Sequence, residues 1–85
     1  MDKKDLLRLR IAAQKLRPTI HVGKDGLSET VIEETQRQLK KSKLVKVRIL
    51  NSLEGDRRAI GIRVAEKTSS TLVDVRGSTI VLARD

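Results

Sequence analysis

Near the start of the chain, apolar residues recur at intervals of three and four positions, which is the period of one face of an α-helix. The main stripe and the two residues that widen it are Leu6, Leu9, Ala13 and Leu16, with Leu7 and Ile11. The pattern predicts an amphipathic helix over residues 2–16. Pro18 ends it, because a proline disfavours helical geometry in the residue before it.

A short strand and a second helix are predicted next. Residues 19–22 alternate between polar and apolar, which places Ile20 and Val22 on the inward face of a strand. Ser28 is a favoured N-cap residue and predicts a helix over residues 28–42. The residues that this helix turns inward are Val31, Ile32, Thr35 and Leu39.

The second half of the chain is rich in β-type patterns. Residues 44–49 alternate again, and their inward residues are Val45, Val47 and Ile49. Residues 71–75 and 79–83 form a closing hairpin around Gly77. The intervening stretch 51–70 begins with a turn-like composition, and the spacing of its later apolar residues suits a strand and a helix equally well. The predicted order is therefore α-β-α-β-(α?)-β-β, with one layer of sheet.

The composition excludes several classes of protein. The chain has 85 residues, which is one small domain, and 38% of them are apolar. It contains no Cys, Trp, Tyr or Phe. Disulfide frameworks, thiolate metal sites, cysteine nucleophiles and aromatic platforms for base stacking are therefore excluded.

Neither a membrane span nor a signal peptide is expected. The longest apolar run, Ile80–Ala83, is far shorter than the roughly 20 residues that cross a bilayer. The opening residues 1–5 are mostly charged and lack the apolar segment of a signal peptide. We therefore expect a cytoplasmic protein without a membrane partner.

The charge balance points to a polyanionic partner. Nineteen Lys and Arg against eleven Asp and Glu give a formal net charge of +8. In a chain that is still apolar enough to fold, this excess favours nucleic acid as the partner. Charge that only keeps the protein in solution, or that meets an anionic membrane surface, is the weaker interpretation.

A four-residue loop, Gly23-Lys24-Asp25-Gly26, lies between the first strand and the capped helix. Two glycines let the backbone approach an anion closely, the amides of the first helical turn point towards it, and Lys24 adds a positive charge. A GxxG loop of this kind clamps the nucleic-acid backbone in KH domains. The structural alternative is that both glycines only serve turn positions with positive φ. Asp25 argues against phosphate unless it hydrogen-bonds its own backbone.

Three blocks of the sequence stand out in a fixed order, namely Leu16–Glu29, Leu44–Arg48 and Val75–Arg84. Together they resemble the CRM (chloroplast RNA splicing and ribosome maturation) domain, and more closely its YhbY-type single-domain members. The resemblance covers nearly the whole chain, 1–85. It implies a compact α-β-α-β-α-β-β fold of the α/β class with a four-stranded mixed sheet, similar to the C-terminal domain of translation initiation factor three. It also implies that residues 57–68 are helical.

The same resemblance implies an RNA-binding module, associated in bacterial relatives with large-subunit ribosome precursors and in plant organelles with intron splicing. The family's glycine loop maps onto Gly23 and Gly26, with Lys24 at its basic position. The residues that we expect to contact RNA are Gly23, Lys24, Asp25, Gly26, Arg17, His21, Ser28, Arg10 and Lys15. Structured RNA, held by phosphates, 2′-hydroxyls and shape, fits a chain without aromatic rings.

Other basic residues and the sole histidine leave alternatives open. Lys40, Lys41 and Lys43 would either bind RNA or only complement a helix dipole. Lys46 and Arg48 face outward on their strand, where contact with RNA is possible but unsupported. His21 is either a solvated strand residue or a contact beside the loop.

An enzyme is not expected. His21 has no nearby Cys or paired carboxylate, so it makes neither a metal site nor an acid–base pair. Ser28 has no oriented base and is explained by its capping position. We expect no cofactor, metal or small-molecule substrate. The alternatives to an RNA-binding protein are a small basic architectural DNA-binding protein and a subunit whose basic face meets an acidic protein.

Overall fold

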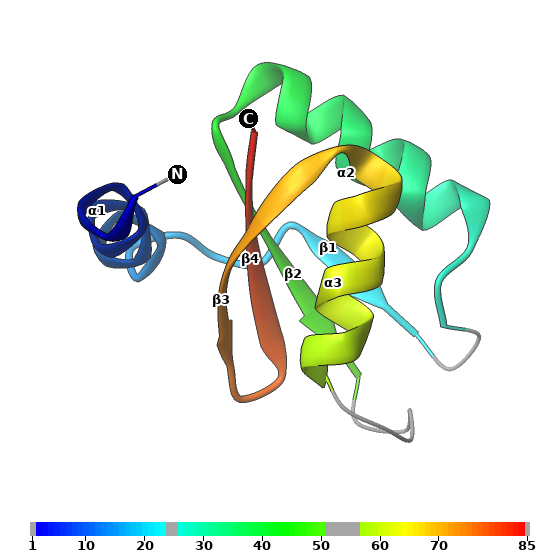
Figure 1. Cartoon of the computed structure of the whole chain (residues 1–85). Coiled ribbons are helices and arrows are strands. Elements are labelled where there is room, and N and C mark those ends of the chain that lie inside the picture. Colours follow the sequence, from blue (N-terminus) through cyan, green and yellow to red (C-terminus); the bar gives the residue numbers. More distant parts are fainter. Residues whose placement is uncertain (1, 24–25, 51–56, 85) are drawn as a thin grey trace.

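The computed structural model describes residues 2–23, 26–50 and 57–84. In chain order the elements are α1 (Lys3–Ala13), β1 (Ile20–Val22), α2 (Glu29–Lys41), β2 (Leu44–Ile49), α3 (Arg57–Thr68), β3 (Ser70–Arg76) and β4 (Thr79–Arg84) (Figure 1). The predicted order is confirmed, and the described part of the ambiguous stretch is helical over Arg57–Thr68. The turn expected at residues 51–55 lies outside the described residues.

The strands form one mixed sheet in the order β1-β2-β4-β3. β1 and β2 are parallel, whereas β4 is antiparallel to both β2 and β3. This topology brings the carboxyl ends of β1 and β2 and the β3–β4 hairpin to one end of the sheet, at the bottom of Figure 1. We call it the turn end, because the glycine loop follows β1 there.

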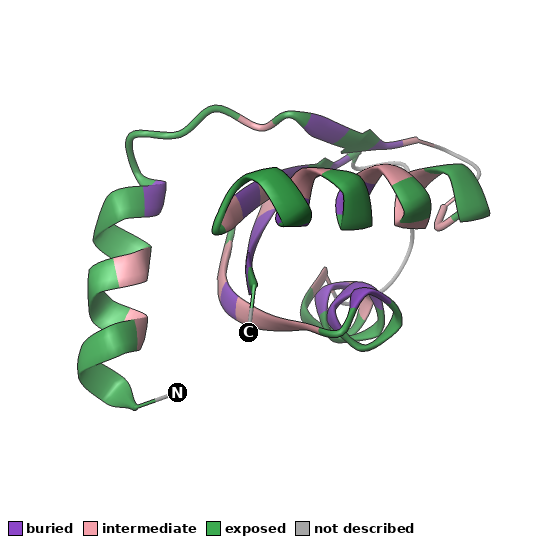
Figure 2. Cartoon of the chain, turned by 90° about the horizontal axis from the view of Figure 1, so that it is seen from above, coloured by how far each residue is buried: buried purple, intermediate pink, exposed green. Residues whose placement is uncertain are grey.

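Helices cover both faces of the sheet, so the protein has two small cores (Figure 2). β4 shows this most clearly, because four consecutive residues, Ile80 to Ala83, are all buried. Ile80 and Leu82 join the core under α2 and α3, and Val81 and Ala83 join the core under α1. The apolar run of β4 is therefore the signature of a strand that is buried on both faces.

Helix α1 is shorter and less buried than predicted. It ends at Ala13 instead of Leu16, because the next amides bond to carbonyls three residues back in a tighter turn. Only its Leu6, Leu9 and Ala13 pack on the sheet. The side chains of three predicted stripe residues are largely exposed: Leu7 is 56%, Ile11 53% and Leu16 39% exposed. The prediction that the whole wide apolar stripe faces the core is therefore wrong. One face of α1 meets the sheet, and the flank that carries Leu7 and Ile11 stays in solvent.

Helix α3 resolves the ambiguity between strand and helix. Its buried residues Gly61, Val64, Ala65 and Thr68 recur with the helical period. A strand would have put Ile62 on the same face as Val64, but Ile62 is 44% exposed. Gly61 avoids a tight contact here, because a Cβ at this position would lie 3.0 Å from a methyl carbon of Leu72. The glycine lets α3 approach β3 closely.

The inward faces predicted for β1 and α2 and the turn at Gly77 are confirmed, with Val31 and Ile32 of α2 only partly buried. Ile20 and Val22 of β1 are buried, and α2 buries Thr35 and Leu39. Gly77 has a φ of +57°, as its place in the hairpin turn requires. Over the described ranges, no helix has the length and apolarity needed to span a bilayer.

Candidate nucleic-acid interface

The segment from Gly23 to Gly26, which we call the glycine turn, connects β1 to α2 at the turn end of the sheet (Figure 1). The Gly26 N–H donates to the Gly23 carbonyl oxygen at 3.0 Å, which closes a four-residue turn. Lys24 and Asp25, the two central residues of the predicted loop, lie outside the described residues.

The two glycines of the turn differ in backbone conformation. Gly26 has a φ of +74°, in the left-handed region that other residues rarely adopt. Gly23 does not lie in that region, and a Cβ placed on it would meet nothing within 4 Å. The structural explanation therefore accounts for Gly26 but not for Gly23. The backbone at Gly23 borders open space, which leaves it accessible to a ligand.

Ser28 caps the helix that follows the glycine turn, as predicted. Its Oγ accepts a hydrogen bond from the Val31 N–H at 3.2 Å, and its carbonyl accepts from the Ile32 N–H at 3.1 Å. The first four N–H groups of a helix have no intrahelical partner beyond such caps. The amides of Glu29 and Thr30, which have no acceptor within the helix, thus add to the positive end of the α2 dipole beside the turn.

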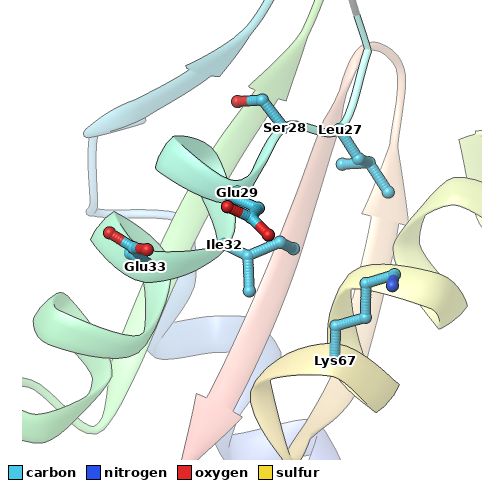
Figure 3. Close-up of a pocket in the computed structure, with 6 residues that line it drawn as sticks. All are labelled: Leu27, Ser28, Glu29, Ile32, Glu33 and Lys67. Atoms are coloured by element: carbon cyan, nitrogen blue, oxygen red, sulfur yellow. The ribbon is translucent and has the colours of Figure 1, made fainter.

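A depression of about 430 Å³ lies on the α3 side of this helix terminus (Figure 3). Leu27 and Ile32 line it, Glu29 and Glu33 of α2 stand on one side, and Lys67 of α3 approaches from the other. Two carboxylates against one ammonium group would repel phosphate. The depression is therefore the acidic side of this helix terminus, and the opposite side is the face of the sheet that carries α1 (Figure 2).

His21 lies on that face. Its neighbours Ile20 and Val22 point into the core under α2 and α3, so the exposed His21 side chain points to the opposite side. It is paired in register with Arg48 of β2, which is also exposed. Within the described ranges, no three His, Cys, Asp or Glu side chains gather closely enough to hold a metal ion.

The structure separates three predicted RNA contacts from the glycine turn. Arg17 precedes β1 whereas the turn follows it, which puts about 20 Å of extended chain between Arg17 and Gly23. Lys15 is exposed but lies beyond the end of α1, near the start of the segment that leads to β1. The Arg10 Nε donates to the Val73 carbonyl at 3.0 Å, so this side chain holds α1 against β3.

Lys46 also has a structural role. Its Nζ donates to the carbonyl oxygens of Ala13 and Leu16, at 3.4 and 3.3 Å. The ammonium group thereby provides a hydrogen-bond donor for backbone carbonyls at the carboxyl end of α1, and it links this end to β2.

The trio Lys40, Lys41 and Lys43 is exposed at the carboxyl end of α2, a helix length of about 20 Å from the glycine turn. The Arg84 guanidinium already donates to the carbonyls of Leu39 and Lys40, at 3.3 and 3.0 Å. The trio therefore does not join the residues at the turn end.

Arg76 was missed by the sequence reasoning, which assigned it only to a turn. The structure places it beside α1, in a small groove with Arg10, Lys46 and Asp74. Simple alternation along β3 predicts the wrong face for it, because the register shifts between Leu72 and Asp74. Only the strand pairing reveals this shift.

Comparison with known proteins assigns the whole fold to one family. A family model described as CRS1 / YhbY (CRM) domain matches residues 1–84. The solution structure of the protein SAV1595 from Staphylococcus aureus, described as a candidate RNA-binding protein, superposes with a TM-score of 0.88 at 32% identity. That match covers 100% of this chain and 88% of the other.

Two curated relatives are similar over most of the chain. "Probable RNA-binding protein YqeI" of Bacillus subtilis (strain 168) is 32% identical over 77 residues, 91% of this chain and 80% of that protein. "Probable RNA-binding protein MJ0652" of Methanocaldococcus jannaschii is 40% identical over 78 residues, 89% of this chain and 58% of that protein.

Proposed function

The chain belongs to the CRS1 / YhbY (CRM) domain family, and from this premise we propose that it is an RNA-binding protein that holds the phosphate backbone at the glycine turn. Both curated relatives are named for RNA binding, and the net charge of +8 suits a polyanion. The protein acts by binding and not by catalysis.

The observation that carries this proposal is the accessible backbone at Gly23. Among the described residues, none would contact a Cβ at Gly23 within 4 Å, and its φ is not in the left-handed region. A missing Cβ is useful if a phosphate comes close to the main chain. The adjacent amino end of α2 and the predicted positive charge of Lys24 favour the same ligand.

The RNA that fits is structured. With no aromatic side chain, the protein lacks the platforms on which unpaired bases stack. Phosphates, 2′-hydroxyls and helix shape remain as the recognised features. Within this class we propose large-subunit ribosomal RNA or its precursor particles as the target. Crosslinking in cells, followed by sequencing of the attached RNA, tests this, and reads without enrichment in large-subunit ribosomal RNA would contradict it.

The binding assay is fluorescence anisotropy with a hairpin fragment of large-subunit ribosomal RNA, titrated at several salt concentrations. If about 4 to 6 phosphates are neutralised, log affinity should fall with log salt with a slope of roughly 3 to 5. A slope below about 1 would reject the proposed surface. Duplex DNA of equal length serves as the competitor, and equal affinity for it would favour an architectural DNA-binding protein.

The sharpest variant is Gly23→Ala. Because a Cβ has room at this position, the free energy of unfolding should not fall. RNA affinity should drop about tenfold, since displacing a phosphate from a backbone amide costs roughly 1.5 kcal/mol or more. Unchanged affinity in a stable Gly23→Ala protein would show that the backbone at the turn does not approach RNA.

Charge reversal gives a second, independent test. Lys24→Glu with Arg17→Glu should weaken binding, and Lys24→Glu alone should account for most of the loss because Arg17 lies at the far end of β1. Arg63→Glu with Lys67→Glu is the matched control, since it changes the charge equally on the exposed side of α3. Equal effects of the two double variants would point to net charge alone.

A further inference from the structure

Four residues at the turn end of the sheet form one row across all four strands. The register pairs His21 with Arg48, Arg48 with Thr79, and Thr79 with Arg76. Neighbouring strands are about 4.8 Å apart, so the row spans about 14 Å from β1 to β3. We call it the cationic row.

The row faces the α1 side of the sheet. Each member is followed or preceded by a residue that packs under α2 and α3, and these four neighbours are Val22, Ile49, Ile80 and Val75. Since side chains alternate between the faces of a strand, all four members of the row point the other way. α1 packs on the same face but closer to the end of the sheet opposite the turn end, around Val81 and Ala83.

The charges of the row are available to a ligand. His21, Arg48 and Arg76 are exposed. Over the described part of the chain, none of these three side chains makes a hydrogen bond or ion pair. Arg10 and Lys46 on the same face differ, because both donate to backbone carbonyls. The two arginines of the row are therefore not used to hold the fold together.

Three described carboxylates lie around the row and the glycine turn, and two of them are on the α3 side. Asp74, which shares this face, sits one row further along, opposite Val81, and its Oδ1 already accepts from the Val75 N–H at 3.0 Å. Glu29 and Glu33 lie on the other side of the glycine turn. The α3 side thus presents two carboxylates, whereas the α1 side presents two guanidinium groups and the Asp74 carboxylate.

We infer that the cationic row is a second phosphate-binding track, along which RNA crosses the sheet from β1 towards β3. The inference rests on the proposed function. His21 is two residues before Gly23, so the track begins beside the glycine turn. Arg48 and Arg76 are two strand spacings apart, about 10 Å, which lets each guanidinium hold a separate phosphate. The Thr79 Oγ1 donates to the Arg76 carbonyl at 2.8 Å and helps to fix the hairpin end.

The test is the double variant Arg48→Gln with Arg76→Gln in the same anisotropy assay with the ribosomal RNA hairpin. Each phosphate contact contributes about 0.7 to 0.9 to the salt slope, so the slope should fall by about 1.5. Affinity should fall most at low salt. Arg48→Lys with Arg76→Lys should keep most of the slope, because the charges remain. Arg63→Gln with Lys67→Gln, which removes the same charge from α3, should keep the full slope.

The outcomes separate this inference from the proposed function. In one outcome the unaltered protein binds RNA, Gly23→Ala weakens binding, and the row variant has the same salt slope as the α3 control. The cationic row then does not bind phosphate, whereas the proposed phosphate contact at the glycine turn is supported. If the unaltered protein shows a slope below about 1, the proposed function fails and the row fails with it. Thermal unfolding of each variant is the control for folding, and these exposed substitutions should leave the unfolding temperature nearly unchanged.

Discussion

Replacing Gly61 with alanine tests the close approach between α3 and β3 in the core under α2 and α3. Gly61 is buried in the middle of α3. A Cβ there would lie 3.0 and 3.3 Å from the two Cδ atoms of Leu72 and 3.3 Å from the Cγ2 of Ile80. Carbon atoms in contact prefer about 3.5 to 4.0 Å, so the neighbours would have to move.

Two effects of opposite sign decide the result. In a helix interior, alanine is more stabilising than glycine by about 1 kcal/mol. Forcing an extra carbon into a packed core costs typically about 1 to 3 kcal/mol. Ile80 is fully buried and cannot retreat, whereas Leu72 is partly exposed and can adjust. We therefore expect Gly61→Ala to lower the free energy of unfolding by about 1 kcal/mol.

A double-mutant cycle with Leu72→Val makes the prediction specific, because valine lacks both Cδ atoms. Urea denaturation of the four proteins should show a favourable coupling of about 1 kcal/mol between the two substitutions. Arg63→Ala on the exposed side of α3 is the control and should stay within about 0.5 kcal/mol of the unaltered protein. Stabilisation by Gly61→Ala with no coupling to Leu72 would refute the close packing of α3 on β3.

Two further substitutions test the ends of the helices. Ser28→Ala removes the acceptor of the Val31 N–H and should lower the free energy of unfolding by about 1 kcal/mol in urea denaturation; a loss under about 0.3 kcal/mol would mean that the cap does not form. Lys46→Met removes the donor to the carbonyls of Ala13 and Leu16, so hydrogen exchange should accelerate in α1 and not in α2. Equal protection of α1 in both proteins would contradict the tie between α1 and β2.

Local patterns in the sequence were sufficient for much of this fold. The period of α2, its Ser28 cap and the alternation of β1 and β2 predict elements that the structure contains with nearly the same bounds. These features depend on neighbours within a few positions, where side-chain geometry follows directly from helical or extended backbone. Net charge and the spacing of Gly23 and Gly26 likewise needed no tertiary information.

The composition of the candidate surface depended on pairings between distant segments. The bulge between Leu72 and Asp74 turns Arg76 to the face that holds Arg48, although regular alternation from Leu72 would place it under α3. Likewise, Arg17 is close to the glycine turn in sequence but is separated from it by the length of β1. A strand pattern determines which residues share a face only while its alternation is unbroken. Register and bulges are set by contacts across the sheet, and so only the tertiary structure assembles the cationic row.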